Sequence, residues 1–208
     1  AGPFTVANLM GGNAAFRDAL RRYGETLMPW FRSPASLDEK VEAGIPWRSA
    51  DRGDTVSYSN LIFEEVSRML LGAYFGLACE VVESGVMEIS DLELGVELGL
   101  GLRPPFSMMN ALGPARTRGI VQAYAKSHPG FRVPRSFGPF EVPCVRREDR
   151  DAVAVLTLRR PRALNALDLK AVREIGAHLE AVGKDPAIRG AVITGFGVKA
   201  FVSGADLP

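Results

Sequence analysis

The chain has 208 residues, 47% of them hydrophobic and 24% charged, a composition typical of globular proteins and not of disordered ones. Its 25 basic and 24 acidic residues are interspersed and give a formal net charge of +1, which favours neither a nucleic-acid partner nor a membrane surface. Cys79 and Cys144 are too few for a disulfide framework or a zinc site, so we expect apolar fillers in a cytoplasmic protein.

The segment that opens the chain recurs about a hundred residues later. Five residues match at a shift of 102, namely Pro3/Pro105, Phe4/Phe106, Thr5/Ser107, Asn8/Asn110 and Gly11/Gly113. The run PWFRSP at 29–34 then matches PGFRVP at 129–134 at a shift of 100. We interpret the matches as a duplicated helical module. In each copy proline begins a short helix, Thr5 or Ser107 caps it, and glycine ends it, which favours a structural junction over a catalytic role.

Between the copies, apolar residues recur at steps of three and four and predict a long helix over 60–84. Ser59 is expected to cap this helix and Gly85 to end it. Ser90 and Glu93 form a capping-box pattern for a short helix to about Leu98. The polar, turn-rich run at 44–56 indicates a linker between the modules.

Beyond residue 142 the periodicity changes. The apolar, β-branched runs at 152–158 and 190–195 predict two strands, and the segment 168–182 predicts an amphipathic helix between them. This order is typical of the crossover unit of an α/β domain. We interpret the charged run RREDRD at 146–151 as a solvated connector between domains.

Two glycine-containing segments follow the second strand. GFGVKA at 195–200 satisfies a dinucleotide-binding pattern, but no helix is expected after it, so the signal is weak. KAFVSGADL at 199–207 can bring main-chain N–H groups close to a ligand as an oxyanion hole, although a loop that only turns the chain has the same composition. The two histidines, His128 and His178, suggest neither a base nor a metal ligand, and surface positions are expected for both.

The last sixty residues resemble the start of the enoyl-CoA hydratase (crotonase) family, on VAVLTLRRPRALNALDL and AVITGFGVKAFVSGADL. The resemblance implies that Arg162, Ala163 and Leu164 lie along coenzyme A. It implies that Ala205 donates its N–H to the oxyanion hole. It also implies that further residues line the acyl thioester, namely Ser203, Gly204 and Leu207. The acid/base glutamates of the family and its second N–H donor are expected after Pro208.

The first 140 residues resemble, in duplicate, the helical C-terminal domain of 3-hydroxyacyl-CoA dehydrogenases. The resemblance rests on ACEVVESGVMEISDLELGVELGLGLRPPFSMMNALG at 78–113 and on GPFTVANLMGG at 2–12. That family carries a catalytic Asn in a Val-Asn-Arg phrase, where this chain has Ser67. The second copy is therefore expected to have lost direct catalysis, and the NAD-binding domain and its His-Glu pair would precede Ala1.

These resemblances together imply a mostly α, multidomain chain with tandem dehydrogenase-type helical modules followed by the first β-α-β unit of a crotonase-like domain. The expected domains are 1–50 (a partial first module), 51–142 (the second module) and 150–208 (the hydratase start). The chain lacks an initiator Met and a charged leader, and it stops where a helix is due, so we expect a longer parent protein.

The implied parent hydrates trans-2-enoyl-CoA and oxidises 3-hydroxyacyl-CoA with NAD in fatty-acid β-oxidation. Its partner is an acyl-CoA, and its helical modules are expected to pack on each other or on another subunit. The 208 residues alone are expected to be inactive, since they carry no general base and no nicotinamide site. The alternative is a catalytically silent helical scaffold for docking or oligomerisation.

Overall fold

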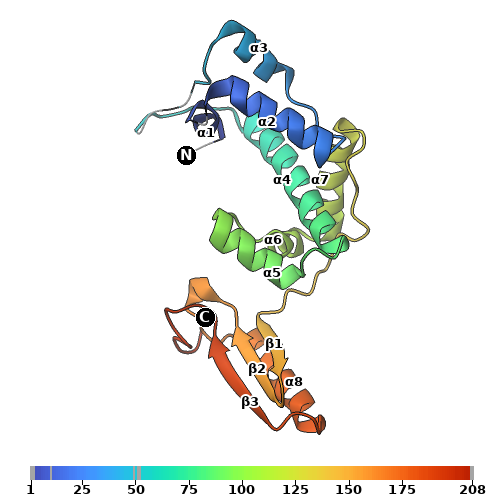
Figure 1. Ribbon diagram of the computed structural model, residues 1–208, viewed down its shortest axis with the longest axis vertical. Coiled ribbons are helices and arrows are strands. Elements are labelled where there is room, and N and C mark those ends of the chain that lie inside the picture. The colour runs from blue at the N-terminus through green and yellow to red at the C-terminus, as the bar shows by residue number, and fades with distance from the viewer. Residues whose placement is uncertain (1–2, 10, 49, 51–52, 207–208) are drawn as a thin grey trace. The chain divides into compact units, whose positions relative to one another are not determined.

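A computed structural model describes residues 3–9, 11–48, 50 and 53–206 (Figure 1). The chain divides into two compact units. Unit 1 comprises Ala1–Glu80 with Pro114–Phe137, and unit 2 comprises Val81–Gly113 with Gly138–Pro208. The boundary between the units falls within one long helix, α4.

Unit 1 is helical, with α1 (Pro3–Leu9), α2 (Gly12–Thr26), α3 (Ala35–Ala43), α7 (Pro114–Ser127) and most of α4 (Asn60–Glu83). The long helix predicted over 60–84 is confirmed. The Ser59 hydroxyl accepts a hydrogen bond from the Ile62 N–H at 3.3 Å. Beyond the helix, the Gly85 N–H donates to the Val82 carbonyl at 3.0 Å, as expected of the residue that ends it.

An aromatic cluster packs α7 and the segment after it against α4 in unit 1. The Phe131 ring lies against Gly76 and Tyr124 lies against Gly72, where a Cβ atom would leave too little room. Trp30, which follows α2, contributes the third ring, with its centroid 5.0 Å from that of Phe131 in an edge-to-face arrangement. Glycines in α4 therefore create the surface that receives these rings.

The two copies of the repeated phrase build the same contacts. In the first copy the Asn8 amide group donates to the Trp47 carbonyl at 2.9 Å and accepts from its N–H at 3.1 Å, while Phe4 and Trp47 rings lie 4.6 Å apart. In the second copy Asn110 pairs in the same way with the backbone of Phe140, at 2.8 Å for both bonds. The Phe106 and Phe140 rings lie 4.9 Å apart.

The second match of the repeat also recurs in structure. Tyr23 and Phe31 meet edge to face at 5.7 Å, and Tyr124 and Phe131 do so at 4.8 Å. The copies differ in the next segment, where α3 has no helical counterpart after Phe131. The sequence interpretation of a duplicated helical segment is supported by these paired contacts.

Two capping predictions are wrong, and one residue explains both. Ser107 lies inside α6 (Pro105–Leu112), and Ser90 lies inside α5 (Ile89–Gly95), which has no side-chain cap. Because Pro105 has no N–H, the first amides of α6 that need an acceptor belong to Phe106 and Ser107. The Glu93 carboxylate accepts from both, at 2.6 and 3.3 Å, and also from the Ser107 hydroxyl. Glu93 thus caps the next helix and not its own.

Unit 2 also holds a three-stranded sheet of β1 (Val145–Arg150), β2 (Val153–Leu158) and β3 (Gly190–Gly195), in that order. β2 and β3 are parallel, and α8 (Leu169–Lys184) connects them and packs against the strands (Figure 1). The side chain of Asp168 accepts the Ala171 N–H at 2.7 Å and so caps α8. The predicted strand, helix and strand are confirmed, with a core of Val145, Leu156, Leu158 and Ala171.

The connector interpretation of 146–151 is wrong, because most of these residues form β1, antiparallel to β2. The strand buries Val145 and keeps its charges at the edge of the sheet, where Arg147 and Asp149 pair through two bonds of 2.7 and 2.8 Å. Charged side chains are common on edge strands because they disfavour further strand pairing. Sequence periodicity therefore did not predict this strand, because all but one of its residues are charged.

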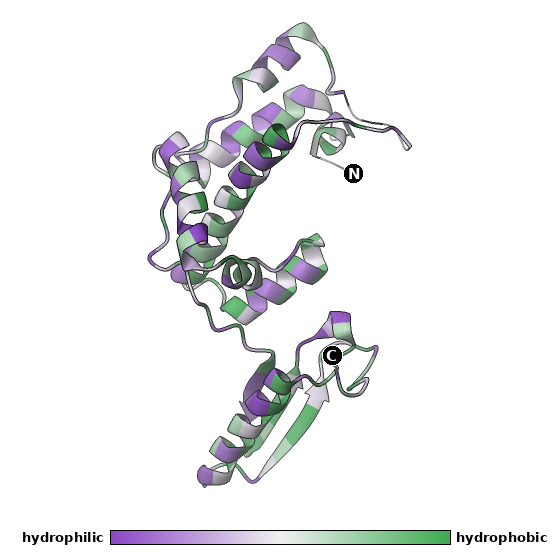
Figure 2. Cartoon of the chain, turned by 180° about the vertical axis from the view of Figure 1, so that it is seen from behind, coloured by the Kyte–Doolittle hydropathy of each residue, from purple (hydrophilic) through white to green (hydrophobic). Residues whose placement is uncertain are grey.

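Hydropathy varies strongly along unit 2. β3 is apolar along most of its length (Figure 2). Its side chains Val192 and Ile193 are nevertheless partly exposed to solvent, and β3 is the last strand in the order β1-β2-β3. Cys79 is buried and Cys144 half-buried, and neither forms a disulfide. Within the described ranges, no helix combines the length and the apolar character needed to cross a membrane.

Candidate active site

The candidate site lies on two loops that follow β2 and β3. Because parallel neighbouring strands end at the same edge of a sheet, the loops after them meet there. The Ser203 N–H donates to the Leu164 carbonyl at 3.1 Å, and the Leu167 N–H donates to the Gly204 carbonyl at 2.9 Å. Predicted site residues from the two sequence blocks are thus brought side by side.

Asn165 fastens the two loops together. Its side chain is buried, and its amide donates to the carbonyls of Phe196 and Ala200 at 3.1 and 2.9 Å. Its carbonyl oxygen accepts from the Arg160 N–H at 3.1 Å. Leu164 and Asn165 both have left-handed backbone conformations, with φ of 49° and 57°, which is unusual at a non-glycine residue.

Arg160 forms a second connection. Its guanidinium pairs with Asp206 at 2.7 Å and with Asp168 at 3.1 Å, and it also donates to the Ala166 carbonyl. The loop after β3 is therefore tied both to the loop after β2 and to the capping residue of α8. Both carboxylates are thus engaged in structural ion pairs with Arg160.

Ala205 presents a free main-chain donor at this place. Ala205 forms an isolated parallel bridge with Leu167. The two hydrogen bonds of this bridge run from the Leu167 N–H to the Gly204 carbonyl and from the Asp206 N–H to the Leu167 carbonyl, so neither uses the Ala205 N–H. The N–H of Ala205 therefore points away from Leu167, and no residue in the described ranges accepts it. Ala205 is exposed, and Gly204 before it has a φ of +130°, which a side chain disfavours. An exposed N–H of this kind can donate to the oxygen of a ligand.

The residues predicted along coenzyme A lie on the loop after β2, where Ala163 and Leu164 are hydrogen-bonded to Ser203. Arg162 and Ala163, in the short helix η2 (Pro161–Ala163), line a cavity of about 290 Å³, and Leu164 is partly exposed. The Ser203 hydroxyl donates to the Ala163 carbonyl at 3.1 Å, so its oxygen is held at the loop. Leu207 lies outside the described residues.

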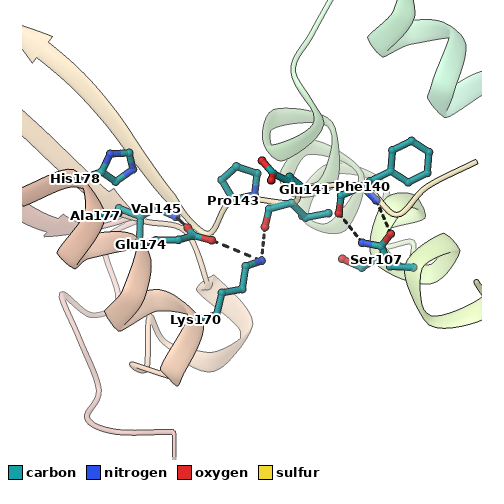
Figure 3. Close-up of a pocket in the computed structure, with 11 residues that line it drawn as sticks. Ser107, Phe140, Glu141, Pro143, Val145, Lys170, Glu174, Ala177 and His178 are labelled. Atoms are coloured by element: carbon teal, nitrogen blue, oxygen red, sulfur yellow. Dashed lines mark hydrogen bonds and ion pairs between the residues drawn. The ribbon is translucent and has the colours of Figure 1, made fainter. Parts of the chain in front are cut away.

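A second cavity, of about 760 Å³, lies between α6, α8 and the segment before β1 (Figure 3). Its polar groups bind one another: Lys170 donates to the Val142 carbonyl and pairs with Glu174, which accepts the Val145 N–H at 2.8 Å. His178 lines this cavity and is half-buried. His128 is also half-buried, in unit 1, where its ring stacks on Tyr124 at 3.9 Å, so neither histidine is fully exposed.

Cys144 lies beside Glu174 and is not an activated thiol. Burial, reinforced by the negative charge of Glu174, raises the pKa of Cys144 to about 12. The thiolate is the reactive form of cysteine, so this residue is inert near neutral pH. The interpretation of Cys144 as a filler agrees with this environment.

Comparison with known proteins gives a family match over the candidate site. The enoyl-CoA hydratase/isomerase family matches residues 148–208, which contain both loops. The match covers the C-terminal part of the chain, where the sequence resembles the crotonase family. The coenzyme A thioester site expected on these two loops stays a prediction.

The chain is similar to a crotonyl-CoA hydratase of Syntrophomonas wolfei subsp. wolfei, at 45% identity over 60 residues, or 29% of this chain and 23% of that protein. It is similar to a mitochondrial 3-hydroxyisobutyryl-CoA hydrolase of Rattus norvegicus, at 42% identity over 29% of this chain and 16% of that protein. An enoyl-CoA hydratase/isomerase structure from Mycobacterium paratuberculosis shares 37% identity over 31% and 25% of the chains, with a TM-score of 0.30. The chain spans about a quarter or less of the length of these relatives.

Sequence reasoning missed Asn165 and Arg160, which hold this crotonase segment together. A signal was present for Asn165, since Asn tolerates the left-handed conformation better than most residues and stands here between apolar neighbours. Arg160 gave no such signal, because its partner Asp206 lies 46 residues away in the sequence.

Proposed function

We propose that the chain is part of an enzyme that adds water to a trans-2-enoyl-CoA thioester. The proposal rests on one observation, the free and exposed N–H of Ala205 within a crotonase-family segment. When water adds to the double bond, negative charge develops on the thioester oxygen, and a fixed main-chain donor stabilises that charge.

The other proposed roles follow from position for the described residues, and that of Leu207 follows from the family resemblance alone. Arg162, Ala163 and Leu164 hold coenzyme A beside the cavity, while Ser203, Gly204 and Leu207 line the thioester. The carboxylates nearest to Ala205 are bound by Arg160, so we propose that the general acid and base come from residues after Pro208. Some relatives are named as hydratases and another as a hydrolase, and the assay must therefore distinguish addition of water from cleavage of the thioester.

We further propose that the repeated helical segments belong to a 3-hydroxyacyl-CoA dehydrogenase-type part, so that the parent acts in fatty-acid β-oxidation. The repeated contacts of Asn8 and Asn110 support a duplication, and the dehydrogenase assignment rests on sequence resemblance alone. The described residues do not fit NAD, since the glycine run at 195–200 leads into a loop and not into a helix. NAD is proposed to bind a domain outside them.

The test is hydration of crotonyl-CoA by the full-length protein, followed as loss of the absorbance of the conjugated thioester. We expect saturable hydration without release of free coenzyme A. Changing Ala205 to proline removes the N–H and should lower kcat by about 100-fold or more. Circular dichroism must show that the variant is folded. A folded wild-type protein that neither hydrates nor binds crotonyl-CoA would favour the silent scaffold instead.

A further inference from the structure

The cavity beside Arg162 has one wall from the crotonase segment and another from the helix that follows α4. Glu97 lies on η1 (Val96–Leu100), a π-helical turn that continues α5. Glu97, Arg162 and Ala163 all line this cavity of about 290 Å³. The residues proposed to hold coenzyme A therefore meet a helical segment that lies outside the crotonase match.

Glu97 holds Arg162 by one nitrogen only. The Glu97 Oε1 atom accepts a hydrogen bond from the Nε–H of Arg162, with 2.8 Å between oxygen and nitrogen. The Glu97 side chain is 15% exposed, whereas that of Arg162 is 57% exposed. In the described part of the chain, no other acceptor binds the Arg162 guanidinium. Its two terminal nitrogens remain free, and these form the planar fork that binds phosphate through two hydrogen bonds.

The second carboxylate of the same helix is already occupied. Glu93 also lines the cavity, but its oxygens accept the amides of α6. Glu97 is one helical turn further along and is the acid that reaches Arg162. The π-helical turn ends at Gly101, which has a φ of +65°. Departures of this kind from α-helical geometry are frequent at functional sites.

We infer that Glu97 is a positioning residue for substrate binding: it fixes the guanidinium of Arg162 so that the terminal fork faces the anionic part of coenzyme A. The inference rests on the proposed function and adds a residue from the helical part to that site. Glu97 does not contact the reacting atoms, so it affects binding of the thioester and not the chemical step.

Two opposing effects of Glu97 must be compared. Its negative charge repels a phosphate, but Arg162 lies between the two and water around this exposed side chain screens the repulsion. Its hydrogen bond orders a long side chain before the ligand arrives, which removes an ordering cost from binding. We expect ordering to be the larger effect, so that loss of Glu97 weakens binding.

The test compares four forms of the full-length protein: wild type, Glu97→Ala, Glu97→Gln and Asp91→Asn. Asp91 is the matched control. It lies on α5 and pairs with Arg159, just after β2, at 2.6 Å and with Arg146 of β1 at 3.3 Å. It therefore makes comparable ion pairs from the preceding helix without pairing with Arg162. Each form is assayed with crotonyl-CoA and with crotonyl-pantetheine, which lacks the nucleotide phosphates.

We expect Glu97→Ala to raise KM for crotonyl-CoA by about two- to tenfold, with kcat unchanged and no effect on crotonyl-pantetheine. Glu97→Gln keeps an oxygen acceptor for Nε and should restore most of the affinity. An unchanged or lower KM in Glu97→Ala would overturn the inference, and so would an equal effect of Asp91→Asn or an equal effect on crotonyl-pantetheine. If the wild type itself neither hydrates nor binds crotonyl-CoA, the proposed function fails and this inference fails with it.

Discussion

Glu93 is the residue whose environment departs most from expectation. It is 7% exposed, and burial raises the pKa of its carboxyl. The hydrogen bonds from Ser107 and Phe106 act in the opposite direction, and the charge of Glu97 raises the pKa further. A group that is harder to ionise in the folded state than in the unfolded state links folding to pH.

The sign of this linkage gives a prediction. Because the folded-state pKa of Glu93 is raised above 4.5, the proton stabilises the folded state below that pH, and this contribution is lost as pH rises through the folded pKa. Relative to Glu93→Gln, which does not titrate, wild type should therefore lose stability as pH rises above about 4.5 toward neutrality. Chemical denaturation at several pH values measures the difference. A stability difference between wild type and Glu93→Gln that stays flat across this pH range would contradict the assignment.

At the scale of elements, the end of β3 depends on close contact with the loop that follows it and with Asn165. A Cβ atom on Gly195 would collide first with the Phe201 carbonyl oxygen, and it would lie 2.6 Å from the Asn165 amide nitrogen and 2.7 Å from the Ala200 carbonyl oxygen. Gly190, at the other end of the same strand, has nothing within 4 Å of that position. The two glycines form a matched pair.

We expect Gly195→Ala to destabilise the protein by about 1–3 kcal/mol, because overpacking forces the two loops apart. Gly190→Ala should cost less than about 1 kcal/mol. Thermal unfolding and crotonyl-CoA hydration measure the two variants side by side. Equal behaviour of the two would mean that the loops do not depend on this contact.

The elements that the sequence predicted well are those with a clear period. The helix α4 and the unit of β2, α8 and β3 follow from apolar spacing, because one buried face dictates that spacing. The strand β1 could not be predicted in this way, since its first residue, Val145, is its one buried residue and the five that follow are all charged. The capping role of Glu93 depends on a partner in another helix, and such contacts leave no local pattern. Site residues on a turn, such as Ser203 and Gly204, could be proposed from family resemblance but not from periodicity.

At the scale of the whole molecule, the two copies of the repeat meet at equivalent positions in unit 1. Trp30 and Gly130 match at the shift of 100, and a Cβ atom on Gly130 would lie 2.8 Å from the Trp30 Cβ. Contact between a residue and its own counterpart is the mark of an approximate two-fold relation. Only one of the two positions can hold a large side chain, which accounts for tryptophan facing glycine.

A double-mutant cycle tests this pairing. Gly130→Ala should destabilise the protein strongly when Trp30 is present, both by this contact and because Gly130 has a φ of +95°. In the Trp30→Gly background, which removes the Trp30 Cβ atom, the contact part should vanish, leaving a coupling of about 0.5–3 kcal/mol between the two changes. Chemical denaturation of the four proteins gives this value. Strict additivity would show that the copies do not press on each other here.

The central claim is that the Ala205 amide donates to the thioester carbonyl of an enoyl-CoA. The most direct measurement is the isotope-edited infrared spectrum of crotonyl-CoA carrying a ¹³C-labelled thioester carbonyl, bound to the full-length protein. We expect the carbonyl stretch to move to lower wavenumber on binding, because the donor polarises the bond, and we expect Ala205→Pro to reduce the shift. A bound thioester whose carbonyl stretch matches that of the free ligand would contradict the claim.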